Sequence, residues 1–199
     1  DGNGSIDTLV GIEHILGSNS ADLLDGSAVA NRLIGGDGGD RLRGLGGDDV
    51  LVGGAGNDTI EGGDGLDTAD YSGGVGTVVI NLALGTANDS VSGSDTLTSI
   101  EIVVGSSLND QIIGASAAEL LFGGAGNDQL SGGDDDDVLI GGLGSDQVAG
   151  GLGTDTADYS DAVGTVVVDL VAGTADDAVS GTDTLSSIET IIGSAFNDQ

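Results

Sequence analysis

The residues best suited to chemistry in this chain are aspartates that recur every nine positions. Residues 53–61, GGAGNDTIE, show the pattern: Gly at positions one, two and four, Asp at position six and an aliphatic residue at position eight. We call each such nonapeptide a row. So many carboxylates suit Ca²⁺, which takes about six to eight oxygen ligands in flexible geometry, better than Mg²⁺, which needs a stricter octahedron. Zn²⁺ prefers Cys and His, and the chain has no Cys and one His.

Two blocks of rows carry the predicted ligands, over residues 35–70 and 123–158. We predict that the position-six aspartates of these blocks bind Ca²⁺: Asp40, Asp49, Asp58, Asp67, Asp128, Asp137, Asp146 and Asp155. Two further aspartates stand in the same phase without the full glycine pattern and are predicted as weaker ligands: Asp22 and Asp110.

The spacing of the aliphatic residues predicts strands rather than helices. One aliphatic residue in nine is too sparse for an amphipathic helix, and glycine at this density opposes helix formation. Short strands of about three residues around position eight, each followed by a Gly-rich turn, would place two rows in one coil of about 18 residues. Stacked coils would then form two parallel sheets around a thin aliphatic core. The predicted fold is therefore an all-β parallel β-roll, or β-solenoid.

This stacking creates an electrostatic problem. Asp40 would lie beside Asp58 of the next coil, and Asp128 beside Asp146. Two like charges one strand spacing apart, about 4.8 Å, repel by about 1 kcal/mol in water and by several near a protein surface. We therefore expect a cation between neighbouring turns, held by two Asp carboxylates and by backbone carbonyls of the turns.

A longer repeat of 88 residues contains the rows. Residues 67–72, DTADYS, recur at 155–160, and residues 8–95 align with 96–183 without a gap. We predict one unit over 8–95, with rows over 8–70 and a spacer over 71–95. The second unit spans 96–183, with rows over 96–158 and a spacer over 159–183. Residues 184–199 open a third unit and residues 1–7 end a preceding one, so we expect a segment of a longer array.

The spacers contain alternating apolar residues, which predict a strand. One face is formed by Val78, Ile80 and Leu82 in the first spacer and by Val166, Val168 and Leu170 in the second. We expect each spacer to act as three irregular half-coils, so that a unit rises as five coils, about 24 Å, in one continuous solenoid. Tyr71 and Tyr159 are expected to cap the core where the rows end.

The charge of the chain excludes several classes of protein. Three Arg and no Lys oppose 34 acidic residues, for a formal net charge of −31. Nucleic-acid binding and adhesion to anionic membranes both need clustered cations. No apolar run approaches the roughly 18 residues of a membrane-spanning helix, so we expect no transmembrane segment. We also expect no enzyme, because a Ser-His-Asp triad would need the single His14 and metal binding already explains the paired carboxylates.

The rows resemble the calcium-binding nonapeptide of the RTX (repeats-in-toxin) family, G-G-x-G-x-D-x-U-x, where U is apolar. The resemblance implies a parallel β-roll with Ca²⁺ held between stacked turns. It also implies secretion by Gram-negative bacteria, commonly through a one-step (type I) exporter, with folding triggered by extracellular calcium. The spacers resemble segments found between such blocks in long surface proteins.

Four positions depart from the family pattern. Leu45 replaces Gly at position two and Asp135 replaces Gly at position four, where a positive φ is costlier than for Gly. Asn31 and Glu119 stand where Asp belongs, so sites that use them are expected to be weak or empty. In the run 134–137 only Asp137 is in ligand phase, and the other three residues are expected to face solvent.

The sequence thus predicts a calcium-binding structural module of an extracellular or cell-surface bacterial protein, serving as stalk, spacer or surface-array segment. Its expected partners are calcium ions and flanking repeats of the same chain or like subunits in an array. Two alternatives stay open: a secretion and folding module of an enzyme or toxin, and a ligand-binding adhesive module. A catalytic or acylated domain upstream would favour the first, and glycan binding the second.

Overall fold

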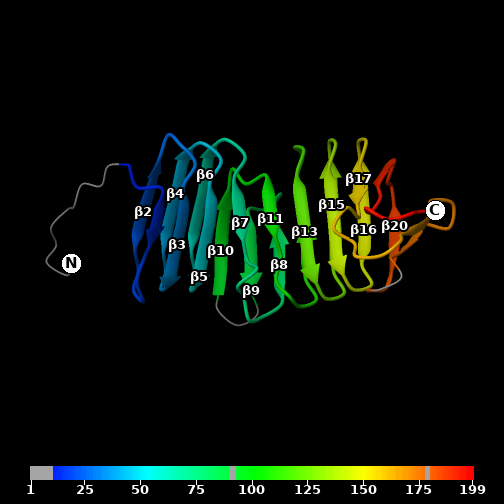
Figure 1. The fold of residues 1–199 in the computed structure, drawn as a ribbon. Coiled ribbons are helices and arrows are strands. Elements are labelled where there is room, and N and C mark those ends of the chain that lie inside the picture. The colour runs from blue at the N-terminus through cyan, green and yellow to red at the C-terminus, as the bar shows by residue number, and fades with distance from the viewer. Residues whose placement is uncertain (1–10, 90–92, 178–179) are drawn as a thin grey trace, which may run out of the picture.

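The computed structural model describes residues 11–89, 93–177 and 180–199. In these ranges every regular element is a strand, and the strands form two sheets that run the length of the molecule (Figure 1). Among the same residues no helix has the length and apolarity to cross a bilayer. The predicted end of a preceding unit, residues 1–7, lies outside the described residues.

Sheet A has nine strands in the described part of the chain, and every pair in it is parallel. In spatial order they are β1 (His14–Leu16), β3 (Arg32–Asp37), β5 (Val50–Ala55), β7 (Thr68–Asp70), β11 (Ile102–Val104), β13 (Leu120–Ala125), β15 (Val138–Leu143), β17 (Thr156–Asp158) and β21 (Thr190–Ile192).

Sheet B has twelve strands in the same described ranges and mixes parallel with antiparallel pairs. In spatial order they are β18 (Val167–Asp169), β19 (Thr174–Asp176), β20 (Thr182–Ser186), β16 (Gln147–Leu152), β14 (Gln129–Asp134), β12 (Gln111–Ile113), β8 (Val78–Asn81), β9 (Thr86–Asp89), β10 (Gly93–Thr98), β6 (Thr59–Asp64), β4 (Arg41–Gly46) and β2 (Leu23–Ser27).

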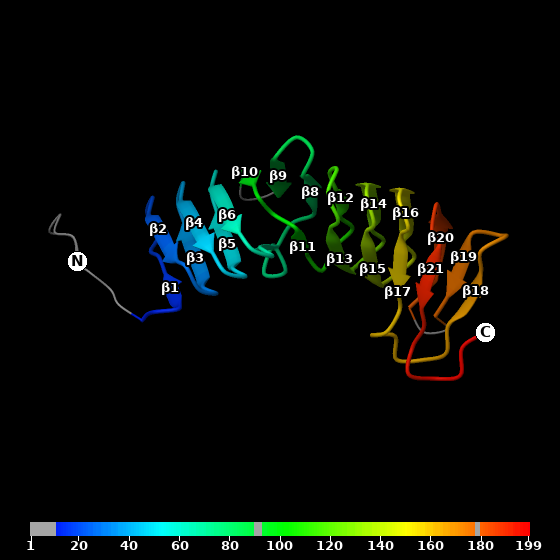
Figure 2. The same cartoon turned by 90° about the horizontal axis from the view of Figure 1, so that it is seen from above.

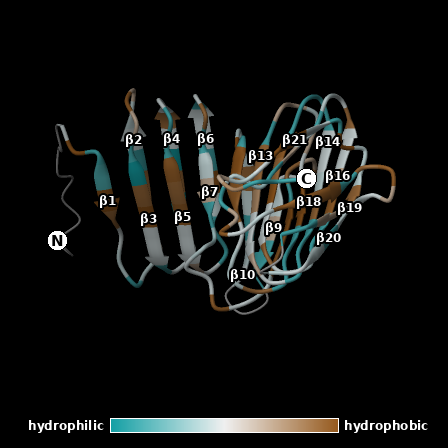
Figure 3. Cartoon of the chain, turned by 45° about the vertical axis from the view of Figure 1, so that its right-hand side comes forward, coloured by the Kyte–Doolittle hydropathy of each residue, from teal (hydrophilic) through white to brown (hydrophobic). Residues whose placement is uncertain are grey.

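The predicted coil of two rows is confirmed by the pairing register within the blocks. Leu33 of β3 pairs with Leu51 of β5, and Leu42 of β4 pairs with Ile60 of β6, each 18 residues later. These four position-eight side chains are fully buried. Burial of one such side chain contributes about 1.5–3 kcal/mol, and Figure 3 shows hydrophobic residues along the middle of β3 and β5. The core is a narrow layer of mostly aliphatic side chains, to which each sheet contributes one column.

Most strands of the two blocks are longer than the predicted three residues, although β7 and β17 have three each. Those from β3 to β6 and from β13 to β16 have six residues each. They continue past position nine because the glycines that open the next row also pair in register, as Gly36 does with Gly54. The Gly-rich segment is therefore part strand and part turn.

Each spacer inserts strands into sheet B only. In the first spacer, β8, β9 and β10 form an antiparallel meander between β12 and β6. In sheet A, by contrast, β7 pairs directly with β11. The apolar alternation predicted a strand correctly, since Val78 and Ile80 of β8 are buried. The second spacer repeats the meander with β18, β19 and β20.

This one-sided insertion bends the solenoid. From β3 to β13 sheet A advances by four strand spacings, whereas from β4 to β14 sheet B advances by six. At about 4.8 Å per spacing these steps amount to about 19 Å and about 29 Å. Figure 2 shows the resulting arch, with β8, β9 and β10 at its crown. The solenoid is continuous, but the expectation that each spacer acts as three irregular half-coils is wrong, because β8, β9 and β10 all lie in sheet B.

Candidate metal centre

The position-six residues form two columns, one along each edge of the solenoid where the turns join the two sheets. The first-edge column contains Asp22, Asp40 and Asp58, followed by Asp95, and in the second unit Asp110, Asp128 and Asp146, followed by Asp183. The second-edge column contains Asn31, Asp49 and Asp67, followed by Glu101, and in the second unit Glu119, Asp137 and Asp155, followed by Glu189.

One oxygen of each carboxylate ties neighbouring coils together. The backbone N–H of Asp40 donates to Oδ1 of Asp58 at 2.8 Å, and that of Asp128 donates to Oδ1 of Asp146 at 2.8 Å. The second-edge column uses the same bond, for example from Asp49 N–H to Oδ1 of Asp67. These ladders hold each carboxylate against the turn of the preceding coil.

The other oxygen of eight of these carboxylates has no hydrogen-bond partner, although it is buried. Between 0 % and 2 % of each of these residues is exposed. Leaving a buried polar atom unsatisfied costs about 1–3 kcal/mol, and more for a charged group, so these eight atoms in register are places where a bound cation would be stabilising. The atoms are Oδ2 of Asp40, Asp49, Asp58, Asp67, Asp128, Asp137, Asp146 and Asp155.

Backbone carbonyls converge on the same places. A Cβ added at Gly123 would lie 2.6 Å from Oδ2 of Asp128 and 2.6 Å from the carbonyl oxygen of Gly141, one coil further on. At Gly132 the corresponding carbonyl is that of Gly150, at 2.7 Å. The space beside the position-one glycine is thus a cradle bordered by oxygen atoms of two coils, and any side chain there would fill it.

The donor set is one of oxygen atoms. Within residues 11–89, 93–177 and 180–199, no three His, Cys, Asp or Glu side chains come together as a metal-binding group. A cation in a cradle would therefore be held by carboxylate and carbonyl oxygens from neighbouring turns, which is the hard donor set that Ca²⁺ accepts. The residues present fit calcium.

Burial makes several of these carboxylates hard to ionise. The pKa of Asp58 and of Asp128 is raised to about 6, mainly by burial; a backbone N–H hydrogen bond to each carboxylate opposes this shift, and neighbouring acidic groups add to it. Burial also raises the pKa of Asp146, to about 7, with Asp183 and Asp128 adding to the shift. Desolvation disfavours the charged form of a carboxylate. Binding either a proton or a divalent cation would therefore offset the cost of burying its negative charge.

Asp22 and Asp110, the two weaker predicted ligands, lie in a different setting. Oδ2 of Asp22 accepts the backbone N–H of Ser18 at 2.6 Å, and Oδ2 of Asp110 accepts that of Ser106. Neither oxygen is among the buried unpartnered atoms of the described residues. Asn31 accepts a backbone N–H in the same way, from Ser27 at 2.6 Å.

Two functional residues that sequence reasoning missed are Asp95 and Asp183. Oδ1 of Asp95 accepts the N–H of Asp58 at 2.9 Å, so Asp95 continues the first-edge column from the spacer. Oδ2 of Asp95 accepts a hydrogen bond from the hydroxyl of Tyr71, and Oδ2 of Asp183 accepts one from the hydroxyl of Tyr159. The available signal was that Asp-Thr-Leu recurs at residues 95–97 and 183–185, each time 24 residues after a recurring tyrosine.

The expected roles of the two tyrosines and of the acidic run are confirmed. Tyr71 and Tyr159 are buried members of the core cluster, and burial raises the pKa of both phenols. Residues 134–136 are exposed, whereas Asp137 is buried. His14 lies exposed on β1.

The two non-glycine residues at positions where the repeat has glycine adopt the positive φ that glycine has in the other rows. Leu45 at position two has φ 79° and Asp135 at position four has φ 78°. Their rows keep the same turn, because Asp49 and Asp137 retain the unpartnered Oδ2. The departures therefore add strain without changing the turn.

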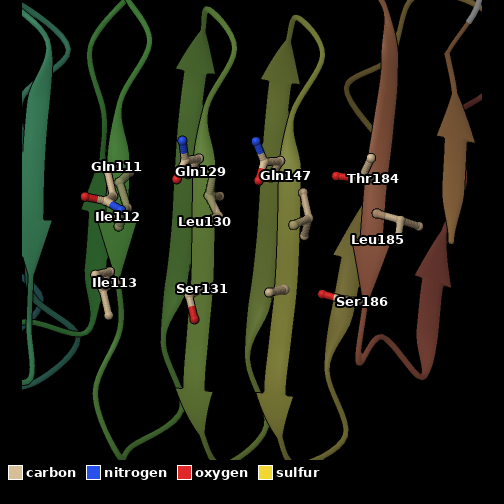
Figure 4. A pocket seen from close by; sticks show the side chains of 12 residues that line it. Gln111, Ile112, Ile113, Gln129, Leu130, Ser131, Gln147, Thr184, Leu185 and Ser186 are labelled. Carbon is tan, nitrogen blue, oxygen red and sulfur yellow. The ribbon is translucent and has the colours of Figure 1, made fainter.

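A pocket lies on the outer face of sheet B. Gln111, Gln129 and Gln147 line it as one in-register row with Thr184 (Figure 4). Its remaining lining residues are aliphatic side chains and serines, with no ionisable group. The pocket is a feature of the repeated strand surface.

Comparison with known proteins agrees with this geometry. The family model described as the RTX calcium-binding nonapeptide repeat (4 copies) matches residues 16–51, 34–69, 43–78, 89–130 and 122–157. Curated protein sequences gave no match. The matched segments cover more than half of the chain, which therefore belongs to the RTX calcium-binding nonapeptide repeat family and folds as its β-roll. This is a structural repeat domain, not a catalytic fold.

Proposed function

We propose that this chain is a calcium-loaded structural module that folds when Ca²⁺ fills the cradles of its two columns. The observation that supports the proposal is the set of eight buried, unpartnered Oδ2 atoms, six of which share the space beside a position-one glycine with a carbonyl of a neighbouring turn. The proposed side-chain ligands are Asp40, Asp49, Asp58, Asp67, Asp128, Asp137, Asp146 and Asp155.

Bound calcium would supply positive charge between carboxylates that otherwise repel one another. The chain itself contributes the rest: N–H ladders that orient each carboxylate, glycines that leave room beside it and a core that holds the turns in register. Because the columns exist only when coils are stacked, the free energy of binding becomes free energy of folding. With little calcium, a formal charge of −31 keeps the chain extended.

The proposed setting is extracellular, as a stalk, spacer or surface-array segment of a bacterial protein. RTX repeats typically occur in proteins secreted by Gram-negative bacteria, where extracellular Ca²⁺ of about millimolar would fill sites of about 10⁻⁴–10⁻³ M affinity. The 88-residue repeat and the continuous sheet A favour a repeated structural segment over a catalytic role.

A calcium titration followed by circular dichroism and small-angle scattering tests this function. We expect an extended, strand-poor chain in chelator, a compact β-rich chain in millimolar Ca²⁺, reversal on chelation and little effect of equal Mg²⁺. A compact β-rich chain that chelation leaves unchanged would contradict the proposal. Binding of the loaded protein on a glycan array would instead favour the adhesive alternative.

A further inference from the structure

We propose that the residues at positions two and four decide which rows take calcium, and that the rows of Asp22 and Asp110 are calcium-free caps at the start of each block. This inference rests on the proposed function, because it concerns where the ions bind. It assigns opposite roles to aspartates that occupy the same position in the repeat.

The two kinds of row differ first in backbone conformation. In the blocks 35–70 and 123–158, the residues at positions two and four have positive φ in every row. In the row of Asp128, for example, φ is 110° at Gly124 and 127° at Gly126. Even Leu45, at position two of its row, has φ 79°. In the row of Asp110 these positions are Ser106 and Leu108, and neither has positive φ. The row of Asp22 has Ser18 and Ser20 there, also without positive φ.

They differ next in what faces the carboxylate. In the cap rows the position-two N–H donates to Oδ2, from Ser18 to Asp22 and from Ser106 to Asp110. The serine hydroxyl adds a second hydrogen bond to the same carboxylate, at 2.9 Å in Asp22 and 3.0 Å in Asp110. In the block rows Oδ2 has neither bond.

In the cap rows the serine at position two satisfies the carboxylate that calcium would otherwise bind. An N–H and a hydroxyl satisfy the carboxylate that a cation would otherwise neutralise, and they point their positive ends at the place where the cation would lie. Serine favours this local bond, whereas glycine at two positions allows positive φ and leaves the oxygen free. A cap row therefore needs no calcium to stack on the next coil.

The cap rows also continue the ladder. The N–H of Asp22 donates to Oδ1 of Asp40 and that of Asp110 donates to Oδ1 of Asp128, each at 2.7–2.8 Å. Each block of calcium rows thus begins on a coil whose own carboxylate is already satisfied. This arrangement sets where the column of ions starts.

Exchanging the two turn types tests the inference. The variant Ser106→Gly/Leu108→Gly turns residues 105–113 into GGSGNDQII, with Asp110 unchanged. Calcium bound per folded chain, measured by calorimetry and by metal analysis after dialysis, should rise by one ion. The reverse variant, Gly124→Ser/Gly126→Leu, keeps Asp128 and should lose one ion.

Controls separate this inference from the proposed function. Ser107→Gly changes position three, where no row needs positive φ, and should leave the ion count unchanged. Ser18→Gly/Ser20→Gly offers a second gain-of-ion variant if the first fails to fold, as judged by circular dichroism in calcium. A wild-type chain that binds no calcium would defeat the proposed function, whereas a wild type that binds calcium with unchanged counts in both folded glycine variants would overturn this inference alone.

Discussion

The hydroxyl of Tyr71 donates a hydrogen bond to Oδ2 of Asp95, 2.9 Å away. At the preceding steps of the first-edge column, Asp40 and Asp58 leave this same oxygen without a partner. The first-edge column therefore ends in the spacer at a carboxylate whose Oδ2 accepts a hydrogen bond from a phenol. Tyr159 and Asp183 repeat the arrangement in the second unit.

Removing the phenol should destabilise the spacer without removing a calcium ligand. Tyr71→Phe leaves a buried carboxylate oxygen unsatisfied, which costs about 1–3 kcal/mol. We expect the midpoint of urea unfolding in saturating calcium to fall accordingly, and Tyr159→Phe to act similarly. A double-mutant cycle with Asp95→Asn should give a coupling of about 1 kcal/mol or more, and additivity of the two single effects would argue against the bond.

Neutralising a column aspartate should act on calcium binding itself. Asp137 is buried with an unpartnered Oδ2, whereas Asp134, three residues before it, is exposed. We expect Asp137→Asn to lower the number of bound ions and raise the calcium midpoint of folding several-fold. Asp134→Asn removes the same charge from the same turn and should change neither, so equal effects of the two variants would point to general charge rather than to a site.

Relieving the strained position-two residue should stabilise the calcium-loaded protein. Leu45 has φ 79° and is about half exposed, so its side chain contributes little burial. A left-handed conformation costs a non-glycine residue about 1–2 kcal/mol, and the greater chain entropy of glycine offsets about 0.5–1 kcal/mol of that. We expect Leu45→Gly to gain about 0.5–1 kcal/mol in thermal or urea unfolding.

A matched control for this variant lies in the second unit. Leu143 is also exposed and lies in a Gly-rich turn, but its φ is not positive. Leu143→Gly should therefore be neutral or destabilising. Equal stabilisation by both variants would mean that the strain at Leu45 is not the cause.

Acid should favour the calcium-free fold and oppose calcium binding. Burial raises the pKa of Asp58 to about 6 and of Asp146 to about 7, above the ordinary value of 3.8. A carboxylate whose pKa is raised on folding contributes stability below its ordinary pKa, and loses it as the pH rises through the folded value. Without calcium we therefore expect strand content to increase from pH 7.5 to pH 5 by circular dichroism.

In calcium the dependence should reverse, because the ion needs the ionised carboxylate and protons compete with it. The calcium concentration at half-folding should increase as the pH falls from 7.5 to 5. A midpoint that stays constant across this range would show that these carboxylates are not the ligands.

The sequence was sufficient for the parts of the fold that repeat at short range. The nine-residue period fixes which side chains enter the core, so the burial of Leu33 and Leu51 and their pairing at 18 residues follow directly. The same period indicated the eight aspartates whose second oxygen is buried and unpartnered.

The spacer could not be predicted in the same way. Alternation at Val78 and Ile80 identifies a strand but not the sheet that receives it, and β10 reaches β6 across a separation of 37 residues. The missing glycines predicted that Asp22 would differ from Asp40, but not that Oδ2 of Asp22 would accept a hydrogen bond from the backbone N–H of Ser18. The serine at that position was the available signal, because serine bonds readily to nearby backbone and carboxylate groups.

Crystals of the calcium-loaded chain, measured at a wavelength where calcium scatters anomalously, test the central claim most directly. We expect anomalous peaks in the turns of both edges, each within calcium–oxygen bonding distance of the Oδ2 atom of a block aspartate, and none beside Asp22, Asp110 or Asp95. Turns without any peak, with their carboxyl groups directed into solvent, would contradict the account.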